Sequence, residues 1–476
     1  MIPFYYYSQI WKFISNVSLF YLLLEGIKRT LNYFVSDKKS QKLILTTPDF
    51  KSMIRITFWN GLGFIFFSFI KSYVVIYFFG GSGVDLGIIW ALQPLARLFS
   101  MPIIAFLTDN TSKKRLVLIG SLGRTLAYFL YWLSLVVRNI HMFGIGVFLQ
   151  GLLVGFFWPP FYSLISEKSY KGGRTEALAK GRGQMIGYGF LLGAIISIPI
   201  FTLVSLFLPD NIPLLYSPLL LFATINLIAG YQFYAKIDED LTFDKYFASL
   251  KVNEKENYDI VYVNKELISN KTMSNASSRM FLISFLIFIF AILITSIIGT
   301  VFSPFISAYL IENLLSDISA TIIPIIVMIV YFPAQVISQL LAAKIGKMYD
   351  SISATISIIV IGVSRSVIIL LLIFTFTPID FAIILIFLYI VLESNNYFNQ
   401  AIMSRISIKH RGKVFGLNMW IDQFGRVIGP ILGGILWENL SYDAPFIFAI
   451  IMGISLIPVF IFSIRKLSPN MIEIIQ

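Results

Sequence analysis

The sequence predicts an all-α polytopic membrane protein with about 12 transmembrane helices in two six-helix bundles, and three observations lead to this prediction. Hydrophobic residues make up 57% of the 476 residues and charged residues only 13%, whereas soluble domains hold about 45–50% apolar and about 25% charged residues. The apolar residues form uninterrupted runs, each near the roughly 20 residues that a helix needs to cross a bilayer. Basic residues gather in every second connection between these runs, as expected for alternating crossings.

The composition also excludes several kinds of chemistry. The chain has no cysteine, which excludes thiol catalysis, iron–sulfur clusters and cysteine-ligated zinc. The two histidines, His141 and His410, are too few and too far apart in the sequence for a histidine-based metal site. No G-x4-G-K-[ST] phosphate loop, acid pair or Ser/His/Asp set is apparent. We therefore expect neither an enzyme nor a bound metal or cofactor.

Residues 1–52 precede the first long apolar run. Apolar residues repeat there at intervals of three and four from Ile10 to Phe34, with polar and basic residues mostly on the other side. This spacing predicts an amphipathic helix on the inner membrane face. The alternative is an extra span through residues 5–24, which would place the N-terminus outside. The segment lacks the basic start and the small-residue cleavage site of a signal peptide.

The rest of the chain divides at a polar stretch, residues 236–279, which we interpret as a cytoplasmic linker. We expect a bundle of six spans on each side of it, over residues 53–235 and 280–466, followed by a tail at 467–476. The predicted spans of the first bundle cover residues 53–79, 86–107, 115–137, 142–165, 184–207 and 212–235. Those of the second bundle cover residues 280–310, 319–344, 352–375, 380–404, 413–437 and 445–464.

The basic residues orient these spans. With the N-terminus in the cytoplasm, 30 of the 37 Lys and Arg residues fall in segments on the cytoplasmic side. The outer loops then hold one base, Arg138, and seven acids. This positive-inside distribution places both termini in the cytoplasm. The net charge of +12 is therefore mostly an orientation signal and not a nucleic-acid surface.

A pattern of one acid and one base occurs once in each half. Asp109 follows the second span, and Arg124 lies 15 residues later. Asp350 follows the eighth span, and Arg365 also lies 15 residues later. The stretches between them share a short turn, an aliphatic run and a glycine, which indicates an internal repeat.

A glycine pattern repeats in the same way. The fifth span contains Gly189-x3-Gly193, and the eleventh contains Gly425-x3-Gly429 followed by Pro430. Two related six-span halves are typical of transporters that work by alternating access.

These residues resemble motifs of the major facilitator superfamily over about residues 53–465. The family's loop between spans two and three reads roughly G-x-L-x-D-R-x-G-R-R, and this chain has Ala105 and Ser112 where glycine is usual. The residues that match the motif's acid and basic cluster are Asp109, Lys113, Lys114 and Arg115. The second-half copy keeps Asp350 without the basic cluster. Gly429 and Pro430 resemble a Gly-rich element that drug–proton antiporters carry in span five rather than eleven, so no subfamily is assigned.

The resemblance implies two bundles around a central cavity lined by spans one, four, seven and ten. It also implies that Asp109, its basic neighbours and Asp350 help to lock the cytoplasmic side while the cavity opens outward. The alternative is that these loop residues only fix the topology. Arg124 and Arg365 would lie in peripheral spans, which favours a structural role near the cytoplasmic gate.

Apart from the bases counted on the cytoplasmic side and the acids counted in the outer loops, seven charged residues lie inside the predicted spans, where a charge at mid-helix costs about 2.5–3.5 kcal/mol on the insertion scale. They are Lys71, Arg97, Arg124, Arg365, Glu393, Asp422 and Arg426. The first-half spans contain no acid, so the charges of Lys71 and Arg97 must be balanced by the second half, by a substrate anion or by water. The alternatives are outward snorkelling for Lys71 and a structural role for Arg97.

Both intramembrane acids belong to the second half. Helical spacing places Glu393, Asn396 and Gln400 on one side of the tenth span, which makes Glu393 a candidate for proton coupling or substrate contact. Asp422 has Arg426 four residues later, which predicts an intrahelical ion pair. This pair is either inert or exchanges partners during transport.

The fourth span contributes two further candidates. Gln150 and Trp158 are expected at the cavity wall because the resemblance places this span there. The alternative is that Trp158 packs or anchors its helix, as aromatic residues in membrane spans more often do.

Taken together, these features predict a multi-pass secondary transporter of the cell membrane that moves a small solute by rocking its two halves. The positive charge in the first-half spans favours a solute with an anionic group, and Glu393 favours proton coupling. We expect the partners to be the lipid bilayer, the solute and protons, and the chain to act as a monomer. Two alternatives are an efflux transporter for amphipathic compounds and a non-transporting receptor or scaffold of the same fold.

Overall fold

The computed structural model describes residues 46–64, 71–170, 185–253, 275–319, 322–350, 354–406 and 411–467. Within these ranges the regular secondary structure is helical, apart from one isolated bridge between Thr46 and Ser169. Ten helices of the described part are long and apolar enough to cross a membrane. The all-α polytopic fold class is therefore confirmed. The predicted amphipathic helix from Ile10 to Phe34, and the alternative span through residues 5–24, lie outside the described residues.

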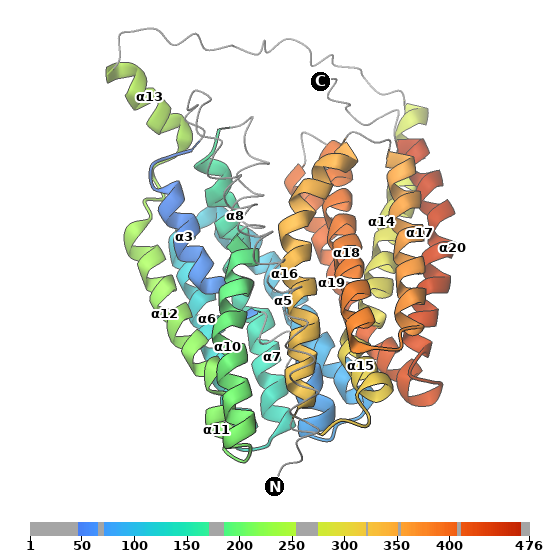
Figure 1. Cartoon of the computed structure of the whole chain (residues 1–476). Helices are drawn as coiled ribbons and strands as arrows, with labels where there is room; N and C mark the ends of the chain where they lie inside the picture. The colour runs from blue at the N-terminus through green and yellow to red at the C-terminus, as the bar shows by residue number, and fades with distance from the viewer. Residues whose placement is uncertain are drawn as a thin grey trace, which may run out of the picture. The chain divides into compact units, whose positions relative to one another are not determined.

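Every predicted span coincides with one or more helices in the described residues (Figure 1). The first half holds α3 (Phe50–Gly61), η1 (Val74–Phe78), α5 (Gly83–Asn110), α6 (Lys113–Val136), α7 (Ile140–Val154), α8 (Trp158–Glu167), α10 (Met185–Phe207), α11 (Ile212–Leu215) and α12 (Ser217–Lys236). The second half holds α14 (Asn275–Val301), η4 (Ser303–Phe305), α15 (Ile306–Leu314), α16 (Ile323–Asp350), α17 (Ala354–Ile373), α18 (Pro378–Ile406), α19 (Arg411–Asn439) and α20 (Ala444–Leu467). Another helix, α13 (Phe243–Asn253), lies in the predicted linker, and the predicted domain limits stay a prediction.

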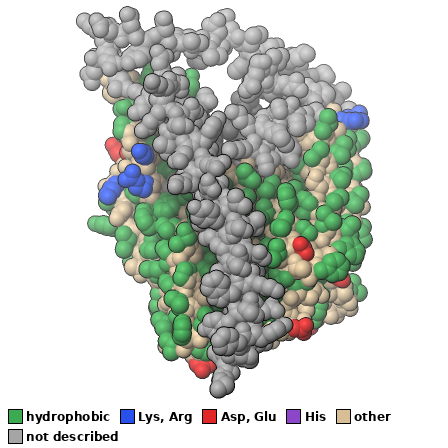
Figure 2. Space-filling view, in the orientation of Figure 1, with side chains coloured by type: hydrophobic (Ala, Val, Ile, Leu, Met, Phe, Trp, Pro, Cys, Tyr) green, Lys and Arg blue, Asp and Glu red, His purple; other side chains and the backbone are tan. Residues whose placement is uncertain are grey.

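The flanks of the helices carry the apolar side chains that a lipid-facing surface requires. Phe106 is 67% exposed and Phe207 is 75% exposed, and many other large apolar residues lie outside the core. Figure 2 shows hydrophobic side chains covering the described part of one face, with Lys and Arg confined to its upper region. In lipid this exposure costs nothing, because hydrocarbon tails are as apolar as the side chains.

The helices of spans one, four and seven are interrupted. In span four α7 ends at Val154, and α8 begins at Trp158 with prolines in its first turn. In span seven the short 3-10 helix η4, which contains Pro304, separates α14 from α15. In span one the π-helix η1 follows Lys71. Interrupted helices commonly flank binding sites in transporters, and π-helical turns are frequent at functional sites.

The repeated glycines pack equivalent helices together in the two halves. A Cβ atom added at Gly193 of α10 would meet the carbonyl oxygen of Leu62, directly after α3. A Cβ atom added at Gly429 of α19 would meet Thr300 of α14. Span five thus approaches the backbone that follows α3, and span eleven approaches the Thr300 side chain and the Ile297 carbonyl of span seven, and a Cβ atom would clash in both places. This shared contact explains the glycine pattern in each half.

The two halves meet along α5 and α19. Backbone contact is direct there, because a Cβ atom added at Gly87 would meet the carbonyl oxygen of Pro430. Near the end of these helices that the charge pattern assigns to the outside, the Gly83 amide donates to Glu438 Oε2 at 2.9 Å. Close by, the Tyr77 hydroxyl donates to Glu312 Oε1 at 2.8 Å. Two predicted outer-loop acids therefore join the halves at this end.

At the opposite end of the first half, Lys168 is fully buried. Its Nζ atom forms an ion pair with Asp49 Oδ2 at 2.7 Å and donates to the carbonyl oxygens of Asp238 and Leu241. The Thr47 amide donates to the carbonyl oxygen of Lys168 at 3.0 Å. One lysine therefore ties the chain before α3 and the chain after α12 to the end of α8, a role that its place among the loop bases did not indicate.

Candidate functional site

A cluster of charges lies where α5 of the first half meets α19 of the second. Arg97 interacts electrostatically with Asp422 and Arg426. Asp422 Oδ2 accepts a hydrogen bond from Arg426 Nε at 2.6 Å, which is the predicted ion pair. Asp422 Oδ1 accepts from Ser296 Oγ of α14, also at 2.6 Å. We call these four residues the Arg97 cluster.

The Arg97 cluster carries more positive than negative charge. It holds two guanidinium groups and one carboxylate, so its net charge is positive. The side chains of Arg426 and Asp422 are 39% and 26% exposed, and Arg97 is only partly buried. The cluster is therefore partly exposed, and among its described members two cations face one anion.

Lys71 lies in the protein interior, next to a tryptophan. It is 3% exposed, and its Nζ atom lies 3.5 Å from the centroid of the Trp90 ring. Trp90 Nε1 donates to Ser72 Oγ at 3.1 Å, which fixes the ring beside the lysine. Arg97 contributes a like charge close enough to interact with Lys71. This burial does not fit the outward-snorkelling alternative, and it adds a second first-half cation to the region around the Arg97 cluster.

Trp158 connects to the same region through an aromatic neighbour. Its ring stacks on Tyr162 with a centroid distance of 5.6 Å and on Phe64 at 6.2 Å. Tyr162 in turn interacts electrostatically with Arg97. The structure thus places Trp158 one side chain away from Arg97.

Gln150, the other span-four candidate, has a different environment. It is 2% exposed, and its Oε1 atom accepts a hydrogen bond from the Tyr131 hydroxyl at 2.6 Å. This buried pair joins α6 to α7, which favours a structural contact over contact with a solute.

Glu393 forms a separate polar region with α16. It is partly exposed and interacts electrostatically with Tyr389, whose side chain is hydrogen-bonded to Gln335. Among the described residues, Glu393 has no hydrogen bond or ion pair, and no contact joins it to the Arg97 cluster. Asn396 is also partly exposed. The side chain of Gln400 lies outside the described part.

The predicted gate residues are only partly described. Asp109 is exposed, and the described part of the chain offers it no hydrogen bond or ion pair. Lys113 forms an ion pair with Glu167 at 3.0 Å, and Lys114 Nζ lies 5.5 Å from the Tyr234 ring centroid. Arg115 is exposed. The side chain of Asp350 is not among those described, so its gating role stays a prediction.

Glu239, which the sequence did not single out, binds the loop that contains these basic residues. Its Oε2 atom accepts hydrogen bonds from Ser112 Oγ at 3.0 Å and from the Lys114 amide at 3.1 Å. A carboxylate at the start of α6 is stabilised by the free amides of the helix N-terminus. No local spacing could have predicted this contact, because it joins residues 125 and 127 positions apart.

Arg124 lies inside the first bundle. It is fully buried, and its Nη1 atom donates to the Asn60 carbonyl oxygen at 2.9 Å and to Asn226 Oδ1 at 3.4 Å. Its guanidinium carbon lies 4.4 Å from the Phe64 ring centroid and 5.1 Å from that of Phe157. Arg124 therefore ties three helices of one half together and does not reach the Arg97 cluster through any described contact.

Comparison with known proteins identifies the family. The model of the Major Facilitator Superfamily matches residues 53–397 and 285–472. No curated protein sequence matches the chain at a significant level.

Solved structures share the fold at low sequence identity. The nucleoside transporter NupG is 13% identical with a TM-score of 0.59, over 88% of this chain and 99% of that one. A bacterial homolog to the human lysosomal transporter Spinster is 11% identical with a TM-score of 0.63, over 90% and 100%. A structure of proton dependent oligopeptide transporters is 11% identical with a TM-score of 0.64, over 88% and 98%. The chain therefore belongs to the major facilitator superfamily, and it is a multi-pass membrane transport protein and not an enzyme.

Proposed function

We propose that the protein is a proton-coupled secondary transporter of the cell membrane for a small solute with an anionic group. The observation that carries this proposal is the Arg97 cluster, in which the Asp422 carboxylate interacts with Arg97 of the first half and Arg426 of the second. The net positive charge of these four residues, with Lys71 nearby, favours a solute that carries negative charge. The similarity of the fold to known transporters does not by itself indicate the charge of the solute.

The same cluster suggests how solute binding is linked to rocking. When α5 separates from α19, Arg97 must leave Asp422, and an unpaired charge within the membrane is costly. An anionic group that contacts both Arg97 and Arg426 would offset this cost in the separated state. A ligand shifts a conformational equilibrium only through such differential binding.

Glu393 is the proposed proton carrier. Its described surroundings are tyrosine and amide side chains rather than cations, so its charge can change without breaking an ion pair. Asp422 is less suited to this role because Ser296 and Arg426 both donate to its charged form.

Counterflow in proteoliposomes tests the anionic preference. Purified protein is reconstituted, and uptake of labelled anionic, zwitterionic, neutral and cationic solutes is measured. We expect an anionic solute to be exchanged, and Arg97→Gln to reduce its exchange at least about tenfold, the effect of a lost charged hydrogen bond. Lys466→Gln, which removes an exposed cation after the last span, is the matched control. Exchange of amphipathic cations only, unaffected by Arg97→Gln, would instead support the efflux alternative.

The coupling role of Glu393 needs a separate measurement. Accumulation of the solute is driven by an imposed pH gradient and compared with counterflow, which needs no net proton movement. We expect Glu393→Gln to abolish the gradient-driven accumulation and to preserve counterflow. If both rates stay at the wild-type level, Glu393 is not the proton carrier.

A further inference from the structure

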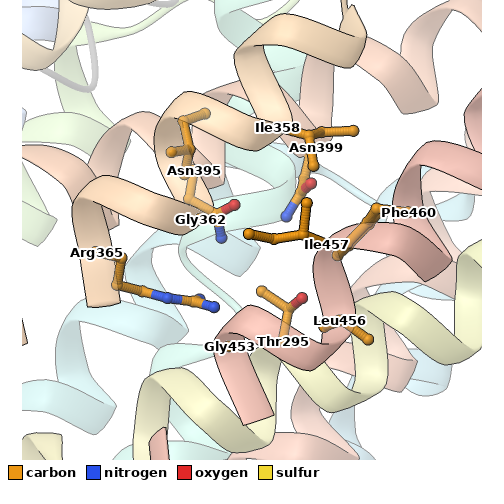
Figure 3. A pocket seen from close by; sticks show the side chains of 11 residues that line it. Thr295, Ile358, Gly362, Arg365, Asn395, Asn399, Gly453, Leu456, Ile457 and Phe460 are labelled. Atoms are coloured by element: carbon orange, nitrogen blue, oxygen red, sulfur yellow. The ribbon is translucent and has the colours of Figure 1, made fainter. Parts of the chain in front are cut away.

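A pocket lies inside the second half, between α14, α17, α18 and α20, with four polar lining residues among aliphatic residues, glycines and Phe460 (Figure 3). Arg365 of α17 extends into it, and the side chains of Asn395, Asn399 and Thr295 line it with the arginine. Arg365 is 4% exposed, and its Nε atom has no hydrogen-bond partner among the described residues. Thr295 Oγ1 is likewise buried without a partner there. We call this space the Arg365 pocket.

The Arg365 pocket contains more donors than its described side chains can satisfy. Arginine has only donors, and the two asparagine amides and the threonine hydroxyl can each donate as well. A buried cation is normally paired, because an unpaired charge inside a membrane protein is costly. No charged side chain of the described residues interacts electrostatically with Arg365. An acceptor that carries negative charge is therefore the group that the pocket lacks.

The size of the cavity limits what can fill it. It measures about 20 Å³, and about 10–15 Å³ measured in this way already holds one water molecule. This space is on the scale of one or two water molecules, which suits a single monatomic ion better than a carboxylate or phosphate group. Asn395 and Asn399 are partly exposed, which leaves a polar route into the pocket.

The backbone of α20 is shaped to admit the guanidinium group. A Cβ atom added at Gly453 would lie 3.1 Å from Arg365 Nη2 and 3.8 Å from its Nε atom. The glycine therefore leaves room for the guanidinium group beside this helix.

We propose that the Arg365 pocket binds one chloride ion, held by Arg365 together with Asn395, Asn399 and Thr295. The ion balances the arginine charge and links α17 to α14 and α18. This site is distinct from the Arg97 cluster and does not depend on the identity of the transported solute.

Binding of labelled chloride to the purified full-length protein tests the proposal. Equilibrium dialysis with ³⁶Cl⁻ is carried out in detergent, with gluconate replacing unlabelled chloride at constant ionic strength. We expect saturable binding of about one ion per chain and a chloride-dependent rise of about 2 °C in apparent melting temperature. Arg365→Gln should abolish both effects, whereas the matched Arg124→Gln variant should keep them. Absence of saturable binding, or binding that survives Arg365→Gln, would overturn the proposal and leave water as the occupant.

Two conservative variants keep the test decisive if Arg365→Gln does not fold. Thr295→Val preserves the side-chain shape and removes the hydroxyl, and Asn399→Leu removes one amide. Each should weaken chloride binding about tenfold, the effect of one hydrogen bond to a charged group. Unchanged affinity in both variants would place the bound ion elsewhere and refute the assignment.

Discussion

The repeat places a buried arginine at the same position in each half, but the two arginines are stabilised differently. Arg124 donates to Asn60 and Asn226 and is surrounded by aromatic rings, and the space beside it has no room for a water molecule. Nε and Nη2 of Arg124 have no hydrogen-bond partner among the described residues, and neither does Nε of Arg365. Arg365 differs because it lies beside a cavity that is lined partly by amides. A shared position in the repeat therefore fixes where the charge lies and not how it is compensated.

The largest expected effect is that substitutions of the two arginines change the stability of the protein in opposite directions. Arg124→Gln loses the short charged hydrogen bond to Asn60, worth about 1.5–3 kcal/mol, and aromatic contacts of about 2 kcal/mol. The bond to Asn226 is long, at 3.4 Å, and is taken to add little. The substitution also removes the cost of holding a charge inside the membrane, which is about 2.5–3.5 kcal/mol. We therefore expect a net destabilisation of about 1 kcal/mol. Arg365→Gln removes the same cost and loses no described hydrogen bond, so without chloride it should stabilise the protein by about 2.5–3.5 kcal/mol.

Thermal unfolding of both purified variants in chloride-free gluconate buffer measures this difference. Addition of chloride should stabilise the wild type and the Arg124 variant, and it should leave Arg365→Gln unchanged. Shifts of the same sign for both variants in chloride-free buffer would show that the two pockets are equivalent after all.

Both halves have a close helix contact at a repeated glycine, and the next largest effect tests whether these two contacts are equivalent. Gly193→Ala and Gly429→Ala each push a methyl group into a neighbouring helix, at an expected cost of about 1–3 kcal/mol. Gly299 of α14 is the matched control, since a Cβ atom there meets nothing within 4 Å. Gly299→Ala should be neutral or should stabilise the helix by up to about 1 kcal/mol.

The apparent melting temperatures of the three glycine variants give the comparison. A similar loss in the first two variants and none in the third would confirm that the repeat preserves a packing contact. If only one of the two destabilises, the halves differ in packing as well as in charge.

The sequence predicted the local features of the fold better than the contacts of the candidate site. The spans follow from apolar runs, and the Asp422–Arg426 pair follows from helical spacing, because both depend on neighbours in the chain. The bond from Ser296 to Asp422 joins residues 126 positions apart, and Ser296 is one of several hydroxyl residues in an apolar run. The burial of Lys168 likewise depends on chain segments before α3 and after α12. Such contacts arise from tertiary packing, which spacing alone does not encode.

The smallest effect concerns the contact that joins the halves at their predicted outer end. Tyr77→Phe removes the hydrogen bond to Glu312, worth about 1 kcal/mol, so the population with that end open should rise about fivefold. Val84 lies beside Gly434 of α19, at the contact between the halves. The chain has no cysteine, so a single Val84→Cys substitution introduces the one thiol that a reagent can label. Its labelling rate by an impermeant thiol reagent should rise about fivefold when Tyr77→Phe is added. Tyr73→Phe is the control, because Tyr73 stacks on Tyr77 and forms no hydrogen bond among the described residues. An unchanged rate with Tyr77→Phe would mean that the glycine contacts between α5 and α19 hold this end closed without the polar pair.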